Sequence, residues 1–229
     1  PFGSVLTLPA TGSEMNNGAV ITKAATQDKL FFFSEHVYPK FSVLDPTTTY
    51  SLPPRQIANG VVDSFVHIVE QYVTYPVNAK VQDRLAEGLL LNIVEDGPKA
   101  LENPTDYDIR ANLMWTATMA LNGLLSTGVP ADWATHLIGQ EITGLYGLDH
   151  AQTLAIALVQ QGQSFRAAGV WHAVAAVQQT QAAQLQQHLA LPSVPVPKTA
   201  RLSTRPKPRE PGARSGEEPA DRKSTRLNS

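Results

Sequence analysis

The chain contains no cysteine, and this absence excludes disulfide bonds, a cysteine-liganded zinc ribbon and a thiol nucleophile. Long apolar runs are absent too, because no stretch reaches the roughly 20 apolar residues that a helix needs to span a bilayer. No signal-peptide pattern opens the sequence. We therefore expect a cytoplasmic protein that is not inserted into a membrane.

Basic residues are scarce in the first two thirds of the chain. Residues 1–159 contain 16 acidic and 8 basic residues, whereas residues 160–229 contain 4 acidic and 10 basic residues. Nucleic-acid binding depends on clustered lysine and arginine, and residues 1–159 hold no such cluster. We therefore expect no nucleic-acid partner. A chain of 229 residues with 42% apolar content can nevertheless bury a substantial core.

The pattern of the sequence changes at residue 53. Residues 1–52 consist of short extended segments separated by glycine, asparagine and proline, which is typical of the edge of an α/β domain. From Pro53 onward, apolar residues recur at intervals of three and four positions, which predicts helices. The predicted strands cover residues 5–8, 19–22, 30–33 and 41–44, and the predicted helices begin at residue 53 and cover about 78–95, 106–126, 131–146 and 149–159.

The expected fold is thus an α/β N-terminal edge, residues 1–52, followed by an all-α domain, residues 53–159. Residues 160–229 differ in character, because glutamine crowds residues 178–187 and seven prolines fall within residues 192–229. The proline-rich residues 192–229 cannot bury enough apolar surface to offset the entropy that they lose on ordering, so we expect them to be a disordered C-terminal tail. We interpret residues 160–229 as a whole as divergent and foreign to the preceding domain.

Four residues of the helical part can hold a metal ion. Asp63 and His67 are four positions apart on one helix, so their side chains lie on one face, one turn apart. His136 lies in a later helix, and His150 lies at the start of the next one. Three imidazoles and one carboxylate suit Fe²⁺ or Zn²⁺ better than Ca²⁺, which prefers more oxygen ligands. Spacing alone leaves a second interpretation open, in which Asp63 and His67 are an ordinary hydrogen-bonded pair on a helix surface.

The helix that carries Asp63 and His67 has a narrow polar stripe on an otherwise apolar surface. Gly60 and Glu70 complete this stripe. We expect the stripe to face a cavity between packed helices, where a buried charge needs a partner.

Four motifs in order resemble those of the iron-containing alcohol dehydrogenase family. GVVDSFVHIVEQY at residues 60–72 resembles its metal-binding helix, in which an Asp and a His four apart precede a Glu and an aromatic residue. HLIGQE at 136–141 and GLDHA at 147–151 look like its third and fourth ligand segments, and TLPATGSEM at 7–15 resembles a threonine-rich loop beside the cofactor. The similarity covers residues 1 to about 159 and points to the NADPH-dependent butanol dehydrogenase or aldehyde reductase branch.

The resemblance implies that Asp63, His67, His136 and His150 together hold one catalytic divalent cation, Fe²⁺ or Zn²⁺. It implies an enzyme that interconverts small aldehydes and primary alcohols by hydride transfer with a nicotinamide cofactor. The ion would polarise the carbonyl oxygen as a Lewis acid, and no catalytic residue is expected beyond its ligands. The architecture implied for the helical part is dehydroquinate synthase-like, and full-length relatives are expected to be homodimers.

The same resemblance places the cofactor beside the N-terminal segment. Thr7, Thr11, Asn16, Gly18 and Lys29 match positions that contact the nicotinamide, ribose or phosphate groups of the cofactor in relatives. NADP(H) is expected in preference to NAD(H), and Lys29 would supply a fixed positive charge. Without the resemblance, the segment that begins at Thr11 would be interpreted as an ordinary turn.

Two features depart from the family pattern. The position one turn after His136 is usually a second histidine, and here it is Gln140, whose amide cannot relay a proton near neutral pH. The family's nucleotide-binding half, with its glycine-rich pyrophosphate loop, is expected before Pro1, so residues 1–52 would be the C-terminal remnant of that domain. We therefore expect the 229-residue chain by itself to lack dehydrogenase activity.

Two other functions stay open on the sequence alone. One is an inactive, truncated helical module that binds a metal or serves as a scaffold without a cofactor. The other is a relative of glycerol dehydrogenase or dehydroquinate synthase, which would share the architecture but catalyse a different reaction.

Overall fold

The structure, a computed structural model, describes residues 1–26, 28–74 and 77–162. The expectations of a divergent region and a disordered tail concern residues that lie almost entirely outside these ranges. Within the described part, helices dominate and the strands are few and short. No helix of the described ranges is long and apolar enough to cross a membrane.

The N-terminal segment forms two small sheets of two strands each. In one sheet the strands run parallel, and in the other they form an antiparallel hairpin with Gly18 opposite Phe33 and Lys23 opposite Asp28. The parallel pair is β1 (Ser4–Val5) with β4 (Ser42–Val43), the hairpin is β2 (Gly18–Lys23) with β3 (Asp28–Phe33), and the two 3₁₀ helices are η1 (Glu35–Val37) and η2 (Pro46–Thr49).

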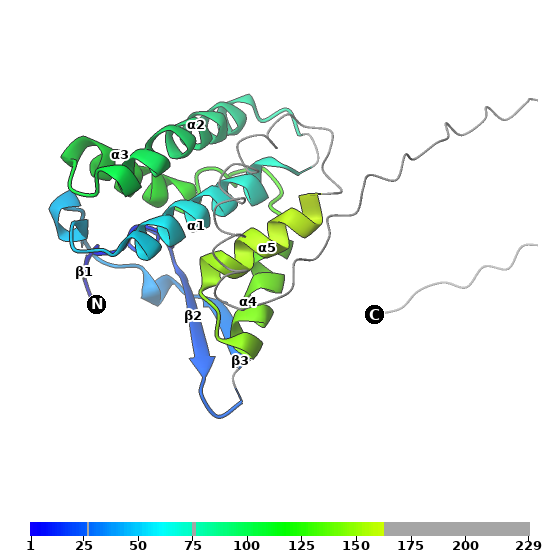
Figure 1. The fold of residues 1–229 in the computed structure, drawn as a ribbon. Coiled ribbons are helices and arrows are strands. Elements are labelled where there is room, and N and C mark those ends of the chain that lie inside the picture. The colour runs from blue at the N-terminus through cyan, green and yellow to red at the C-terminus, as the bar shows by residue number, and fades with distance from the viewer. Residues whose placement is uncertain (27, 75–76, 163–229) are drawn as a thin grey trace, which may run out of the picture. The chain divides into compact units, whose positions relative to one another are not determined.

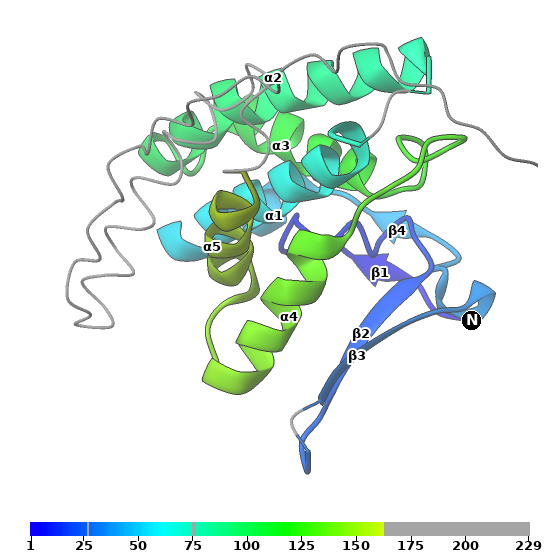
Figure 2. The same ribbon diagram turned by 90° about the vertical axis from the view of Figure 1, so that its right-hand side faces the viewer.

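The rest of the described chain is helical, as the spacing of apolar residues predicts. Figure 1 shows α1 between α5 on one side and α2 with α3 on the other, and Figure 2 shows the β2–β3 hairpin beside α4. The helices are α1 (Pro54–Tyr72), α2 (Lys80–Glu102), α3 (Tyr107–Ala120), α4 (Ala134–Tyr146) and α5 (His150–Gly162).

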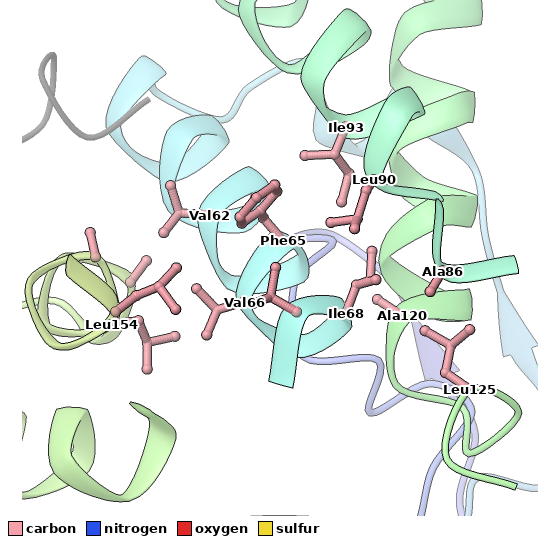
Figure 3. Close-up of a cluster of buried hydrophobic side chains, with 14 residues drawn as sticks. Val62, Phe65, Val66, Ile68, Ala86, Leu90, Ile93, Ala120, Leu125 and Leu154 are labelled. Carbon is pink, nitrogen blue, oxygen red and sulfur yellow. The ribbon is translucent and has the colours of Figure 1, made fainter. Parts of the chain in front are cut away.

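The main hydrophobic core surrounds α1. In Figure 3, Val66 points toward Leu154 of α5, whereas Phe65 and Ile68 point toward α2 and α3. Ile68 is completely buried, and burying a side chain of this size contributes roughly 1.5–3 kcal/mol to the stability of the fold. Because both flanks of α1 are packed, its polar residues are held in a fixed orientation.

Small residues allow the helices to approach closely at two contacts. A Cβ at Gly97 of α2 would lie 2.8 Å from Cγ1 of Val61 on α1, and a Cβ at Gly139 of α4 would lie 2.9 Å from Cδ2 of Leu154 on α5. Any larger side chain would push these helices apart. The contact at Gly139 matters for the site, because α4 and α5 each carry one of the predicted histidine ligands.

Two helices end elsewhere than predicted. α2 continues to Glu102 although Pro98 lies inside it, because residues beyond the predicted end, including the fully buried Ala100, still pack in the core. α3 ends at Ala120, before the predicted end near residue 126. The chain turns there, with Gly123 at a φ of 92°, a conformation that favours glycine.

Candidate metal centre

Asp63 and His67 lie one turn apart on α1, and both are almost completely buried, with 4% of each residue exposed. Their four-residue spacing sets them on one face of the helix, as the sequence predicts. The Oδ1 atom of Asp63 lies 3.8 Å from Nε2 of His67. These two residues are therefore not a surface pair, and the interpretation as an ordinary exposed pair is wrong.

His136 and His150 reach the same place from α4 and α5. His136 lies in the first turn of α4 and is buried. His150 is the first residue of α5, directly after a connection in which Gly147 has the left-handed φ of 67° that ends α4. The sharp turn at Gly147 and the close packing of the two helices bring the two imidazoles together.

The three imidazoles surround one carboxylate oxygen. Oδ1 of Asp63 lies 3.5 Å from Nε2 of His136 and 3.8 Å from Nε2 of both His67 and His150. Ligand atoms of Asp63, His136 and His150 all lie within 4.8 Å of one another. The rings of His67 and His136 stack with their centroids 4.5 Å apart, so His67 lies against the same cluster. For a tetrahedral site with metal–ligand bonds of about 2.1 Å, neighbouring ligand atoms are roughly 3.4 Å apart.

The cluster leaves buried polar atoms without hydrogen bonds. Within the described part of the chain, Oδ1 of Asp63 and Nε2 of His136 are both buried and have no hydrogen-bond partner. Leaving such atoms unsatisfied is costly, and binding a cation between them would relieve that cost. The residues present therefore fit a divalent cation of the Fe²⁺ or Zn²⁺ class in both donor type and spacing.

The electrostatics of the cluster keep Asp63 ionised. Burial by itself raises the pKa of this carboxyl, but the charges of His67, His136 and His150 outweigh burial and hold its pKa well below the ordinary value. Burial lowers the pKa of His67 to about 4 against the opposing charge of Asp63, and the neighbouring imidazoles lower it further by smaller amounts. A neutral imidazole and an ionised carboxylate are the forms that bind metal ions.

The pKa values of the other two histidines are shifted in opposite directions. Burial lowers the pKa of His136, but the adjacent carboxylates of Asp63 and Glu70 outweigh burial and raise its pKa to about 9. Burial lowers the pKa of His150 to about 4 although the charge of Asp63 opposes this shift, and the positive charges of Lys29 and His136 act in the same direction as burial. Without a metal, the cluster thus retains a proton on His136, beside the Asp63 carboxylate.

Lys29 is one of the predicted cofactor contacts, and it lies on β3, which packs against α4. Burial lowers the pKa of its ammonium, and the carboxylate of Asp63 opposes that shift. The positive charge of Lys29 in turn lowers the pKa of His150. The hairpin therefore brings a positive charge close to the centre.

The other predicted cofactor contacts lie in the loop before the hairpin and at its start. Thr7 and Thr11 are both exposed. The Asn16 side chain donates hydrogen bonds to the carbonyl oxygens of Thr11 and Leu121, at 3.0 and 3.2 Å, and accepts one from the amide of Gly18. Asn16 thus ties the loop to the end of α3, and Thr11 keeps an exposed hydroxyl.

Two residues around the cluster were not assigned a role from the sequence. Glu70 contacts Nδ1 of His136. Trp133 lies edge-on to the rings of His67 and His136, with centroids 6.2 and 5.5 Å away. The polar stripe on α1 signals Glu70 but not its partner, and no sequence pattern signals Trp133.

Two family models match the chain: iron-containing alcohol dehydrogenase over residues 1–46, and the Fe-containing alcohol dehydrogenase family, C-terminal, over residues 57–196. The NADPH-dependent aldehyde reductase YqhD of Escherichia coli (strain K12) is 68% identical over 158 residues, which are 69% of this chain and 41% of that protein. The probable NADH-dependent butanol dehydrogenase 1 of Bacillus subtilis (strain 168) is 46% identical over 156 residues, which are 68% of this chain and 40% of that protein.

A crystal structure of YqhD from E. coli K-12 is similar to this structure with a TM-score of 0.69 and 53% identity, over 82% of this chain and 53% of that one. The chain spans well under half the length of the two curated relatives. The C-terminal family match continues past residue 159, where the resemblance was expected to end. Together these similarities confirm the resemblance seen in the sequence, and the chain belongs to the iron-containing alcohol dehydrogenase family.

Proposed function

We propose that this chain supplies the metal-binding part of an oxidoreductase that interconverts aldehydes and primary alcohols with a nicotinamide cofactor. The observation that carries the proposal is the cluster of three imidazole nitrogens around Oδ1 of Asp63. The similarity to aldehyde reductases and butanol dehydrogenases supports the choice of substrate class.

In this proposal, Asp63, His67, His136 and His150 hold one divalent ion, Fe²⁺ or Zn²⁺. The ion supplies Lewis acidity that polarises a carbonyl oxygen for hydride attack on the carbonyl carbon. Asp63 offsets one positive charge, and the imidazoles, which bind in their neutral form, leave the other uncompensated. Burial of Asp63, His67 and His136 limits the access of water, which strengthens electrostatic effects at the centre.

The N-terminal residues hold the cofactor in this proposal. The exposed hydroxyls of Thr7 and Thr11 hydrogen-bond it, Asn16 and Gly18 shape the loop beneath it, and Lys29 supplies positive charge. We propose NADP(H) in preference to NAD(H), by the 68% identity to an NADPH-dependent relative. The 46% identity to an NADH-dependent relative makes NAD(H) the alternative.

In this proposal, the proton that the product oxygen gains does not pass through residue 140, one helical turn after His136. Gln140 is buried one turn beyond His136 on α4, and its amide does not exchange a proton near neutral pH. We therefore propose that solvent supplies this proton from the side of His150, whose side chain is 27% exposed.

The proposal also covers the architecture, the location and the oligomeric state of the enzyme. The helical part would have a dehydroquinate synthase-like architecture, with residues 1–52 belonging to the cofactor-binding domain and residues 53–159 to the metal-binding domain. The enzyme would be a cytoplasmic homodimer without a nucleic-acid partner. The alternatives are an inactive metal-binding module and a relative of glycerol dehydrogenase or dehydroquinate synthase, and the experiment below separates the inactive module and the glycerol dehydrogenase alternative from the proposed function.

The test is a chimera in which the 158 matched residues of this chain replace those of the E. coli relative. We expect the chimera to bind zinc and to reduce butyraldehyde with NADPH, and an Asp63→Ala chimera to lose both properties. A folded, zinc-loaded chimera without activity would contradict the proposed reaction and favour the inactive module. Turnover of glycerol but not of butyraldehyde would favour the glycerol dehydrogenase alternative.

A further inference from the structure

We infer that Glu70 is a positioning residue of the metal centre: it selects the tautomer of His136 and fixes the ring at the first turn of α4. The inference rests on the proposed metal centre and goes beyond its four ligands. Glu70 lies on α1, about one turn after His67, and only 5% of it is exposed.

One oxygen of Glu70 binds the first turn of α4. Oε1 accepts hydrogen bonds from the backbone amides of Thr135 and His136, at 2.6 and 3.3 Å. The residue before α4, Trp133, gives the helix no side-chain cap, and Asp132 accepts from the amide of Ala134 instead. Glu70 therefore caps a helix other than its own, and its negative charge is favourable at the positive end of the α4 dipole.

The second oxygen of Glu70 binds the imidazole itself. Oε2 contacts Nδ1 of His136, and a carboxylate oxygen can only accept, so Nδ1 must carry the proton. With Nδ1 as the donor, Nε2 is the nitrogen left to bind the ion. That Nε2 is the atom found 3.5 Å from Oδ1 of Asp63.

The backbone of the same residue adds a third tie. The carbonyl oxygen of Glu70 accepts a hydrogen bond of 2.9 Å from the amide of Asp132, just before α4. The first turn of α4 is thus fastened to α1 through both the side chain and the main chain of Glu70. Because His67 lies about one turn earlier on α1, these ties set the distance between two ligands on different helices.

The Glu70→Gln substitution distinguishes two roles of Glu70, the capping of α4 and the selection of the His136 tautomer. The amide oxygen of glutamine can still accept from the first turn of α4, but its NH₂ group would face the Nδ1 proton of His136. Two donors repel, so the ring must turn away or move its proton to Nε2. Either change weakens the binding of the ion by Nε2 of His136. Asp96→Asn on α2 is the matched control, because Asp96 is a buried carboxylate whose partners are Lys99 and Asn112.

The experiment uses the whole 229-residue chain with Co²⁺ as the probe. We measure the affinity for Co²⁺ by competition with a chelator, the visible absorption of the bound ion, and urea unfolding of the metal-free protein. We expect Glu70→Gln to weaken Co²⁺ binding about 10–100-fold and to alter the absorption bands, and Asp96→Asn to change neither. Unchanged affinity and absorption in Glu70→Gln, with a loss of stability alone, would overturn the inference and leave a helix cap.

A measurement on the unmodified chain covers the case in which Glu70→Gln does not fold. Nitrogen NMR of labelled histidine in the zinc-loaded chain should show His136 bound through Nε2, with a proton on Nδ1 that is shifted far downfield by the carboxylate. Zinc binding through Nδ1 would overturn the inference while leaving the metal centre intact. Failure of the unmodified chain to bind either ion would contradict the proposed centre itself, and the inference with it.

Discussion

Asp63 carries the negative charge on which the centre depends. Its Oδ1 faces three imidazole nitrogens, yet it has no hydrogen-bond partner in the described part of the chain. Removing one partner from a buried group of charges is costly, because the remaining charge is left uncompensated. Substitution of any of the four proposed ligands should therefore both weaken metal binding and disturb the arrangement of the remaining side chains.

At the residue scale, we predict that His67→Ala strongly reduces metal binding. His67 is the proposed ligand that lies outside the group of Asp63, His136 and His150, whose ligand atoms are all within 4.8 Å of one another. Loss of a group that merely orients a ligand costs about 10–100-fold in affinity, so loss of a ligand should cost at least as much.

The measurement is the zinc content after dialysis, together with NADPH-dependent aldehyde reduction in the chimera. His36→Ala is the control, because His36 is exposed in η1 and lies outside the cluster. Normal zinc content and normal turnover in His67→Ala would reassign this histidine to a structural role.

At the scale of elements, the sequence predicted the helices well where the packing was regular. The apolar spacing from Pro53 and the glycine at residue 147 located the start of α1 and the end of α4. The extension of α2 through Pro98 depends on contacts that local sequence does not contain. The same holds at the site: the residue types indicated the four proposed ligands, whereas the contact of Glu70 with His136 joins residues 66 positions apart. Pairing at such a distance cannot be read from spacing.

A second prediction concerns the approach of α1 to the loop that precedes the hairpin. A Cβ at Gly60 would lie 2.3 Å from the carbonyl oxygen of Pro9, and a backbone atom cannot move aside as a side chain can. We expect Gly60→Ala to destabilise the fold by roughly 1–3 kcal/mol.

Gly88→Ala is the matched control for this prediction. Gly88 is exposed on α2, and a Cβ there would meet no neighbouring side chain or distant backbone within 4 Å, so alanine should stabilise the helix by about 0.5–1 kcal/mol. Urea unfolding of both variants measures the two effects. Equal stability of Gly60→Ala and the unmodified chain would mean that the loop and α1 are not in close contact.

At the scale of the whole molecule, the centre links α1 to α4 and α5, two consecutive helices that lie more than 60 residues further along the chain. The proposed ligands come from α1, α4 and α5, and α1 also forms the middle of the core. An ion that binds the folded state but not the unfolded chain stabilises folding by mass action. The metal should therefore act on the stability of the entire described region and not on the site alone.

A third prediction follows from this linkage. At free Zn²⁺ of about 100 times the Kd, the bound ion should add about 2.7 kcal/mol, or roughly 5–10 °C in Tm, relative to the chelated protein. Thermal unfolding with zinc and with EDTA measures the difference. Asp63→Ala should abolish the zinc-dependent part, and an equal zinc effect in that variant would locate the stabilising ion elsewhere.

A fourth prediction is that the 229-residue chain by itself does not oxidise NADPH in the presence of butyraldehyde. No glycine-rich turn leads from a strand into a helix N-terminus within the described ranges, so the pyrophosphate of the cofactor has no such support there. A loosely held nicotinamide would forfeit much of the roughly 7–11 kcal/mol that positioning can supply. Clear zinc-dependent turnover by the folded chain would contradict this prediction, and the active chimera is its positive control.

The four proposed ligands differ in their exposure to solvent. The side chain of His150 is 27% exposed, whereas those of Asp63, His67 and His136 are 5%, 5% and 9% exposed. The centre is therefore open to solvent on the side of His150 and closed on the side of α1. Substrate and chelator should both arrive over the imidazole of His150, so an inhibitor that fills this approach should slow the removal of the ion by a chelator.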